Sequence, residues 1–192
     1  AISKKMTPGI QVVVARKGKV IYQKSFGNHT YESSQKVSNS DGYDIASLTK
    51  IVATLPNVMQ EFDQGHLTLE TKLKTMLPEA KNSNKANATV LDMLTHQARF
   101  QPWIPFYKAT LDSLNRPSTH FYRSEFSDEF PVHVADKLYL RKNYNDTIVK
   151  TILDSELLPK KQYKYSDFTF ILFKEYLELH NKKSLEDLAH TN

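Results

Sequence analysis

Ser47 and Lys50 lie three residues apart in the segment "YDIASLTK", at the head of an apolar stretch that runs to Gly65. In a helix, residues with this spacing share one face, so the hydroxyl and the amine can touch. A serine hydroxyl is a weak nucleophile until a neighbouring group takes its proton. The pair is therefore a candidate nucleophile and base. The ordinary alternative is a capped helix with a lysine there by chance.

The same Ser-x-x-Lys spacing occurs a second time, at Ser33 and Lys36, inside the polar stretch "HTYESSQKVSNSDG". That stretch is predicted to be a loop, so no helix orients the pair and we interpret it as a chance match. Ser47 differs because it lies in the first turn of a predicted helix. Free backbone N–H groups and the helix dipole can stabilise developing negative charge there, and Asp44 is placed to cap that helix.

A second group of polar side chains, Tyr165, Ser166 and Asp167, comes just before an apolar helix in "YKYSDFTFIL". A phenol, a hydroxyl and a carboxylate can all project from the start of that helix. A phenol, whose ordinary pKa is about 10, can take a serine proton only if nearby cations favour its charged form. A change of about three units would need roughly 4 kcal/mol, which a close, partly buried ammonium such as that of Lys50 can supply.

The elements that must position these residues follow from the hydrophobic pattern. Two strands, Ile10–Ala15 and Lys19–Phe26, are predicted around a turn at Lys17 and Gly18. The helix that carries Ser47 should end near Gly65, and Pro56 should kink or split it because its ring nitrogen cannot donate a backbone hydrogen bond.

Three more helices are predicted further along the chain, and the segments between some of them are predicted to be loops. The helices are expected in "TVLDMLTHQ", "DTIVKTILDSELL" and "DFTFILFKEYLELHN". The aromatic and β-branched start of the last segment leaves a strand open as an alternative. The segments 67–88 and 101–131 are predicted to be loops, the second winding over the surface.

Composition excludes several classes of protein. With 192 residues, 40% of them hydrophobic and 24% charged, the chain is predicted to be globular. The net charge of +5 is scattered, so we expect no nucleic-acid partner. Cysteine is absent, and the seven histidines form no H-E-x-x-H motif, so we expect no metal and no cofactor. All five glycines occur at or before Gly65, which excludes a glycine-rich phosphate loop after that point.

Taken in order, these motifs resemble the β-lactamase-like superfamily of penicillin-binding serine hydrolases, in particular class C β-lactamases, D,D-carboxypeptidases and related esterases. The resemblance covers nearly the whole chain. It rests on "PGIQVVVARKGKVIYQKSFG", "YDIASLTK", "GHLTLETKL", "VLDMLTHQ" and "YKYSDFTFIL" in this order. The stretch "THQARFQPWIPFY" is similar to the branch fused to glycoside hydrolase family 3 domains in Bacteroidetes.

This resemblance implies an α+β, β-lactamase-like fold made of an N-terminal β-hairpin and a helical region. It implies that Ser47 is the acylated nucleophile, Lys50 its partner and Tyr165 the general base or proton shuttle. Asp167 takes the place of an asparagine in the substrate-binding motif. Trp103 is a further substrate-binding candidate that borders a cleft, with simple packing as the alternative.

The implied function is a serine acyl hydrolase of the β-lactamase, D,D-peptidase or esterase type. Its substrate would be a small molecule or peptide with an amide or ester bond, such as a peptidoglycan-derived peptide. The implied location is the bacterial periplasm or cell envelope, with a role at the cell wall.

Two departures from the family pattern bear on that function. An ionised Asp167 can only accept hydrogen bonds, and it could pair with Lys50 and weaken the effect of that lysine on Tyr165. The family's third motif, Lys-Thr-Gly or His-x-Gly, cannot exist after Gly65, and the strand that carries it supplies half of the oxyanion hole. Removing one oxyanion donor costs about 100- to 1000-fold in rate. The alternative is therefore a non-catalytic binding or accessory domain that has lost turnover.

Two residues near the middle of the chain need a separate interpretation. His96 in "LTHQ" is interpreted as a structural hydrogen-bonding residue rather than a base. Arg99 stands where relatives often have glycine, and the sequence offers no physical reason for that change.

We expect residues 1–192 to be a partial domain of a longer protein, processed or trimmed at its front and lacking the late strands of its sheet. The hairpin at Ile10–Phe26 would then expose a strand edge beside apolar side chains. Such an edge invites pairing, by self-association with a second copy, by strand complementation from a separate polypeptide, or by a rearranged segment of the same chain.

Overall fold

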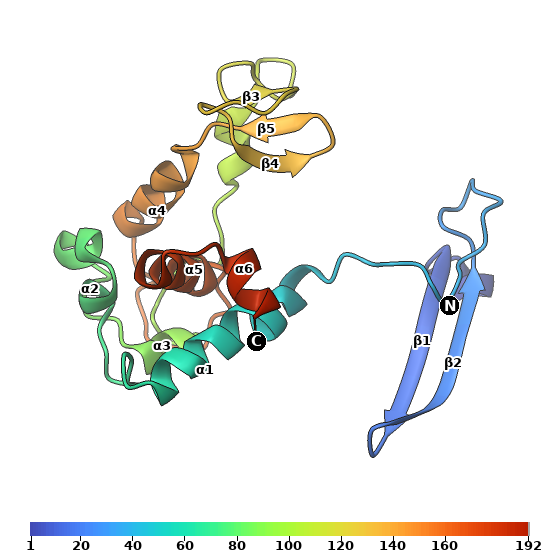
Figure 1. Ribbon diagram of the computed structural model, residues 1–192, viewed down its shortest axis with the longest axis horizontal. Coiled ribbons are helices and arrows are strands. Elements are labelled where there is room, and N and C mark those ends of the chain that lie inside the picture. The colour runs from blue at the N-terminus through green and yellow to red at the C-terminus, as the bar shows by residue number, and fades with distance from the viewer. Residues whose placement is uncertain (192) are drawn as a thin grey trace. The chain divides into compact units, whose positions relative to one another are not determined.

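The computed structural model describes residues 1–191, and the chain divides into two compact units at Ala46 and Ser47. The first unit is a β-hairpin with a polar loop, and the second is mostly helical (Figure 1). The mixed α+β fold predicted from the sequence is thus confirmed. Each unit is described by itself below, and the predicted catalytic and substrate-binding residues all lie in the second.

The hairpin of the first unit follows a short 3-10 turn, η1 (Ile2–Lys4). Its strands β1 (Gly9–Arg16) and β2 (Lys19–Gly27) are antiparallel. The turn residues Lys17 and Gly18 have φ angles of 49° and 74°. Two successive left-handed residues make the two-residue turn whose twist matches that of paired strands. The predicted strands and turn are confirmed, with β1 extending one residue further at each end and β2 one residue further at its end.

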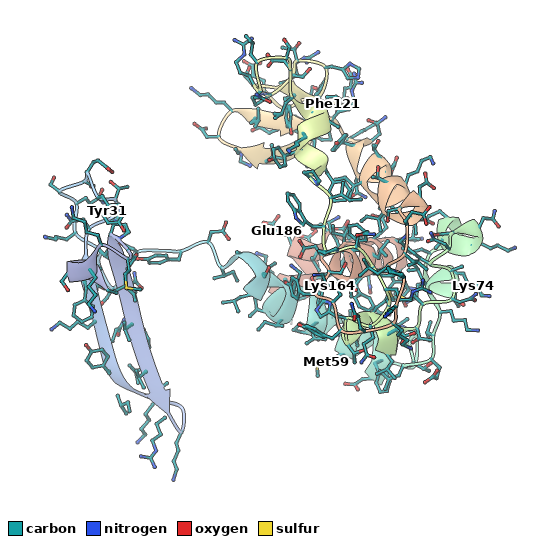
Figure 2. The ribbon with its side chains drawn as sticks, turned by 180° about the vertical axis from the view of Figure 1, so that it is seen from behind. Tyr31, Met59, Lys74, Phe121, Lys164 and Glu186 are labelled. Atoms are coloured by element: carbon teal, nitrogen blue, oxygen red, sulfur yellow. The ribbon has the colours of Figure 1, made fainter. Side chains whose placement is uncertain are left out.

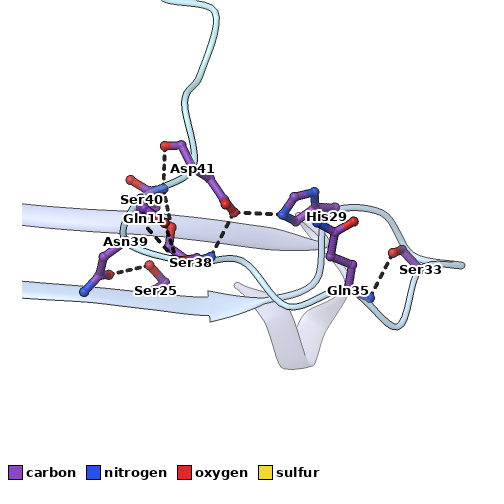
Figure 3. Close-up of polar contacts among 9 residues, drawn as sticks. All are labelled: Gln11, Ser25, His29, Ser33, Gln35, Ser38, Asn39, Ser40 and Asp41. Atoms are coloured by element: carbon purple, nitrogen blue, oxygen red, sulfur yellow. Dashed lines mark hydrogen bonds and ion pairs between the residues drawn. The ribbon is translucent and has the colours of Figure 1, made fainter.

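The polar loop after β2 is held to the hairpin by side chains (Figure 3). Asp41 accepts a hydrogen bond from the backbone N–H of Ser38 at 2.8 Å and lies 2.8 Å from Nε2 of His29. The Ser38 N–H, and after it His29, lower the pKa of the Asp41 carboxyl. Gln11 on β1 donates to the carbonyls of Ser38 and Asp41. The loop has no helix, as predicted.

The helix that was predicted to carry Ser47 is divided into three helical segments. A 3-10 turn, η2 (Ala46–Leu48), and a π-helical turn, η3 (Lys50–Thr54), precede α1 (Leu55–Asp63). Pro56 lies in the first turn of α1, directly after η3, so the helical segment changes its hydrogen-bonding pattern next to the proline, which cannot donate. Gly65, with φ at 77°, follows the end of α1. The predicted interruption at Pro56 and the predicted stop at Gly65 are both confirmed.

The remaining helices complete the second unit. They are α2 (Leu73–Met76), η4 (Pro78–Asn82), α3 (Val90–Leu94), η5 (Phe106–Thr110), α4 (Tyr144–Asp154), α5 (Phe168–Asn181) and α6 (Leu185–His190). The prediction that residues 67–88 form a loop is wrong, because they contain α2 and η4. The strand alternative for the start of α5 is also wrong. No helix within residues 1–191 has the length and apolar character that a membrane crossing requires.

A small antiparallel sheet was not predicted. Its strands are β3 (Tyr122–Arg123), β4 (Val132–Ala135) and β5 (Leu138–Leu140), with β5 in the middle. Figure 1 shows it at one end of the second unit, next to α4. The strands are short, but the alternating pattern of "VHV" and "LYL" around Asp136 and Lys137 is a signal that could have revealed β4 and β5.

The core of the second unit is built around α5. The buried face of α5 packs with side chains from α1, α2, α3 and α4. The core includes Phe168, Leu172, Phe173 and Leu177 of α5, with Val58, Leu73, Met93 and Ile152 of the other four helices. Met59, on the opposite side of α1 from this core, is 58% exposed (Figure 2). Because α5 is anchored along its length, the residues at its two ends are held in place as well. Tyr165 and Asp167 come just before its first residue.

Candidate active site

Ser47 and Lys50 lie within hydrogen-bonding distance, since Lys50 Nζ donates to Ser47 Oγ at 3.1 Å. This contact is the one that their spacing predicted. Asp44 accepts a hydrogen bond from the backbone N–H of Ala46 at 2.7 Å, just before the helical segment. Ala46 itself has a φ of 44°. A left-handed alanine costs of order 1 kcal/mol or more, and such strain is common next to functional residues.

Lys50 is the centre of the site. Its Nζ lies 2.8 Å from Asp167 Oδ1 and 5.4 Å from the centre of the Tyr165 ring. The Lys50 side chain is only 17% exposed. Burial lowers the pKa of Lys50, but hydrogen bonds and charge from Asp167 and then Tyr165 outweigh it, so the pKa is raised. Lys50 is therefore an ammonium at neutral pH.

The ion pair between Lys50 and Asp167 confirms the pairing that the sequence suggested. It has a chemical consequence for Ser47, because an ammonium can donate to the serine oxygen but cannot accept its proton. Lys50 becomes a base only after it loses a proton, and Asp167 makes that loss harder.

His96 positions the segment that carries Tyr165. Its Nδ1 accepts the backbone N–H of Ser166 at 3.3 Å, and its carbonyl accepts that of Lys164 at 2.9 Å. The His96 and Tyr165 rings lie 4.7 Å apart. Burial, and then the charge of Lys50, lower the pKa of His96. A neutral ring is what acceptance at Nδ1 requires, so the geometry agrees with the structural interpretation of His96.

The carbonyl of Pro102 accepts the backbone N–H of Asp167 at 2.9 Å. The backbone of Trp103, the next residue, therefore lies close to the start of α5. Trp103 is 56% exposed and Tyr107 is 53% exposed, whereas Phe106 packs partly against the core. The role of Trp103 in substrate binding stays a prediction, as does its alternative of simple packing. A hollow of about 530 Å³ lies elsewhere, between η4 and α4, and contains none of the predicted site residues.

The backbone at position 99 explains why a glycine would suit it. Arg99 has a φ of 63°, a conformation that glycine adopts without strain. The arginine is held there by hydrogen bonds to Leu158. Its Nε donates to the Leu158 carbonyl at 2.6 Å, and its own carbonyl accepts the Leu158 N–H at 2.7 Å.

One cluster of titratable side chains was missed by the sequence analysis. Glu61, His66 and His180 bring their ligand atoms within 4.8 Å of one another. His66 and His180 are 114 positions apart, so no local motif could have indicated that they meet.

Comparison with known proteins agrees with this fold. The family model described as Beta-lactamase matches residues 1–192, and the chain belongs to that family. The solved structure of a class C beta lactamase from Rhodobacter sphaeroides shares the fold, with a TM-score of 0.62 at 21% identity, over 99% of this chain and 44% of that one.

Two curated relatives are similar over about half of the chain. A "Beta-lactamase" of Providencia stuartii is 32% identical over 109 residues, which are 56% of this chain and 27% of the relative. An "N-acetylmuramyl-L-alanine amidase" of Bacillus subtilis (strain 168) is 29% identical over 113 residues, 52% of this chain and 26% of the relative. The matched parts thus span about a quarter of each relative's length.

Proposed function

We propose that this chain carries the nucleophile of a serine acyl hydrolase that forms an acyl-enzyme on Ser47. The observation that carries this proposal is the contact of 3.1 Å between Lys50 Nζ and Ser47 Oγ, with Tyr165 and Asp167 around the same ammonium. A nucleophile, a cation and a second group able to exchange protons are the parts that acyl transfer requires.

In the proposed reaction, Ser47 Oγ forms a bond to the substrate carbonyl carbon while its proton passes to the Tyr165 phenolate or to a neutral Lys50. The bond from that carbon to the leaving amine or alcohol then breaks, and the same proton passes to the leaving group. Water attacks the acyl carbon in the second half and gives a proton to the same base. That proton returns to Ser47 Oγ as the acyl bond breaks.

The substrate class that we propose is an amide or ester of a peptidoglycan-derived peptide, bound against Trp103 and Asp167. Support comes from the relative named for an amidase of the muramyl–alanine bond. The same relative supports a location at the cell envelope. Whether β-lactams are turned over depends on the Lys50–Asp167 pair, because that pair holds the lysine in its charged form.

Labelling of the full-length protein with a fluorescent penicillin or a fluorophosphonate tests the proposal. Wild-type protein should form an adduct on Ser47, and Ser47→Ala should abolish it. The free energy of unfolding should change by no more than about 1 kcal/mol, since an exposed first-turn serine carries little packing. Ser33→Ala, in the other Ser-x-x-Lys sequence, is the matched control and should label like wild type.

A folded wild-type protein without a Ser47 adduct would contradict this function. It would support the alternative, a binding or accessory domain in which the ion pair with Asp167 keeps Lys50 charged. An equal loss of folding and labelling in Ser47→Ala would indicate a structural role for the serine.

A further inference from the structure

Glu61, His66 and His180 meet on the second unit at the far ends of α1 and α5 from the proposed site. Glu61 is in the last turn of α1, His66 follows that helix, and His180 is in the last turn of α5. The Glu61 side chain is only 4% exposed, whereas His66 and His180 are 44% and 40% exposed. A buried carboxylate thus has two half-exposed imidazoles over it.

Three atoms of this cluster form a small triangle. Glu61 Oε2 lies 2.9 Å from His66 Nδ1 and 3.4 Å from His180 Nε2, and the two nitrogens are 3.3 Å apart. Zinc binds imidazole nitrogen and carboxylate oxygen at about 2.0–2.2 Å with tetrahedral angles, which places neighbouring ligand atoms about 3.3 Å apart. The triangle therefore has the dimensions of one face of such a site.

Protons can also hold this arrangement. One imidazole nitrogen can donate toward Glu61 Oε2 and toward the other nitrogen, which lies 3.3 Å away within hydrogen-bonding distance. A single cation in the same space would replace the hydrogens and bind all three atoms through their lone pairs.

The carboxylate is also held by outer partners, as the ligands of metal sites are. Asn181 Nδ2 donates to Glu61 Oε1 at 2.9 Å, and the Tyr176 hydroxyl donates to Oε2 at 3.4 Å. The Tyr176 ring stacks on His180 at 5.4 Å and 20°.

We propose that Glu61, His66 and His180 bind a divalent transition-metal ion, with Zn²⁺ as the ion to test. Two nitrogens and one oxygen suit such an ion, whereas Mg²⁺ and Ca²⁺ prefer oxygen ligands. The exposed side leaves room for water as a fourth ligand. The sequence-based expectation of no metal considered only ligands close in the sequence, and this cluster is built from distant ones.

The ion would be a clamp between two helical segments. Lys50 and Asp167 pair where those segments begin, and Glu61 and Asn181 pair where they end, so the segments run in the same direction. A metal at the second end would fix the separation of α1 and α5 and, through them, the separation of Lys50 and Asp167. This site does not depend on acylation of Ser47, so the two proposals can fail separately.

The test uses the full-length protein without a histidine tag, stripped with a chelator and titrated with Zn²⁺ by calorimetry. We expect one Zn²⁺ to bind per protein molecule, and the Tm of the second unit to be higher when Zn²⁺ is present. His66→Gln and His180→Gln should each weaken binding by more than about 100-fold, and Tyr176→Phe by about 10-fold, as expected for an outer partner. His190→Gln, an exposed histidine on the neighbouring α6, is the matched control and should bind like wild type.

Cobalt provides a second measurement, because Co²⁺ in a site of this kind gives visible absorption that reports its ligands. The spectrum should change in His66→Gln and His180→Gln but not in His190→Gln, and Ca²⁺ should not compete. Folding of the variants is checked by circular dichroism, and both ligand histidines are half-exposed, so their substitution should leave the core intact. Failure of folded wild type to bind Zn²⁺, or unchanged binding in both variants, would show that the cluster is an ion-pair network only.

Discussion

At the scale of single residues, Asp167 distinguishes this chain from the pattern of its family. The asparagine of the Tyr-x-Asn motif is neutral, whereas Asp167 places a carboxylate 2.8 Å from the Lys50 ammonium. A carboxylate at that distance favours the charged lysine. Lys50 is thus held in the form that donates a proton rather than accepts one.

Asp167→Asn should therefore increase the rate of Ser47 acylation. Removing the carboxylate removes the main interaction that raises the pKa of Lys50, while burial, which lowers it, remains. Neutral lysine then forms at lower pH, so the rise of acylation rate with pH should begin at lower pH. Near neutral pH we expect a gain of about 10-fold for each unit by which the pKa falls. The measurement is the pH profile of labelling.

Asp154→Asn, a change to an exposed carboxylate paired with Lys150 on α4, is a control for the change of net charge and should leave the profile unchanged. An unaltered profile in Asp167→Asn would mean that the lysine does not exchange the serine proton, and Tyr165 would then be the base by itself.

Lys85 is a second residue whose charge is held in an unusual environment. It is 1% exposed and donates to the side chain of Asn84 at 2.9 Å and to the carbonyl of Ser155. Burial lowers its pKa to about 8, although Glu156 and Asp154 act in the opposite direction.

The stability of the protein should consequently depend on pH through Lys85. Unfolded lysine keeps its proton up to about 10.5 and folded Lys85 loses it near 8, so the unfolded state binds more protons between these values. The free energy of unfolding should rise across that range, by up to about 1.4 kcal/mol per pH unit. Lys85→Met should lack this rise in urea unfolding at several pH values. A parallel pH dependence in both proteins would contradict the assignment.

At the scale of secondary-structure elements, the turns that end helices decide where the site residues lie. Arg99 follows α3 with a left-handed backbone, and its two hydrogen bonds with Leu158 connect this turn to the segment after α4. The backbone of His96 is also left-handed, with a φ of 55°, and its ring nitrogen Nδ1 accepts the backbone N–H of Ser166. The positions of Tyr165 and Asp167 thus depend on strained turns three residues apart.

A pair of substitutions at Arg99 should separate backbone strain from side-chain bonding. Arg99→Ala and Arg99→Gly both lose the hydrogen bond from Nε, but only glycine adopts the left-handed conformation freely. We expect Arg99→Gly to be more stable than Arg99→Ala by about 1 kcal/mol, measured by urea unfolding. Equal stabilities would show that the left-handed backbone carries no cost at this position.

At the scale of the whole molecule, the hairpin of the first unit leaves large apolar side chains exposed. Val13, Val20 and Ile21 are 55%, 59% and 64% exposed, and side chains project from both faces of the two strands (Figure 2). An isolated two-stranded hairpin with exposed apolar side chains is marginal by itself and presents strand edges that can pair further. The chain also spans less than half of the class C structure that shares its fold.

We expect the hairpin to pair with further strands, and the oxyanion donor of the family's third motif to come with them. Supplying those strands, on the same chain or in trans, should slow hydrogen exchange in β1 and β2. It should raise ester or amide turnover by at least about 100-fold, if an oxyanion donor is gained. Equal exchange and equal turnover with and without them would show that the 192 residues already hold a complete site. A second copy taking the place of those strands would be seen as concentration-dependent dimerisation.

Local spacing in the sequence was sufficient for the features that depend on neighbours. The hairpin turn needs only two left-handed residues, the interruption at Pro56 needs only a missing N–H, and the contact of Ser47 with Lys50 needs only one helical turn. Asp167 could also be matched with Lys50 in advance, through the order of the family motifs.

Only the tertiary structure decided the features that depend on packing between distant segments. The left-handed turn at Arg99 is stabilised by Leu158, and the carboxylate of Glu61 faces His180 because α5 packs against α1. Helices α2 and η4 are too short to show a helical period, so burial of Leu73, Met76 and Ala80 stabilises them rather than propensity. Burial of this kind is a property of the assembled core, and no window of the sequence contains it.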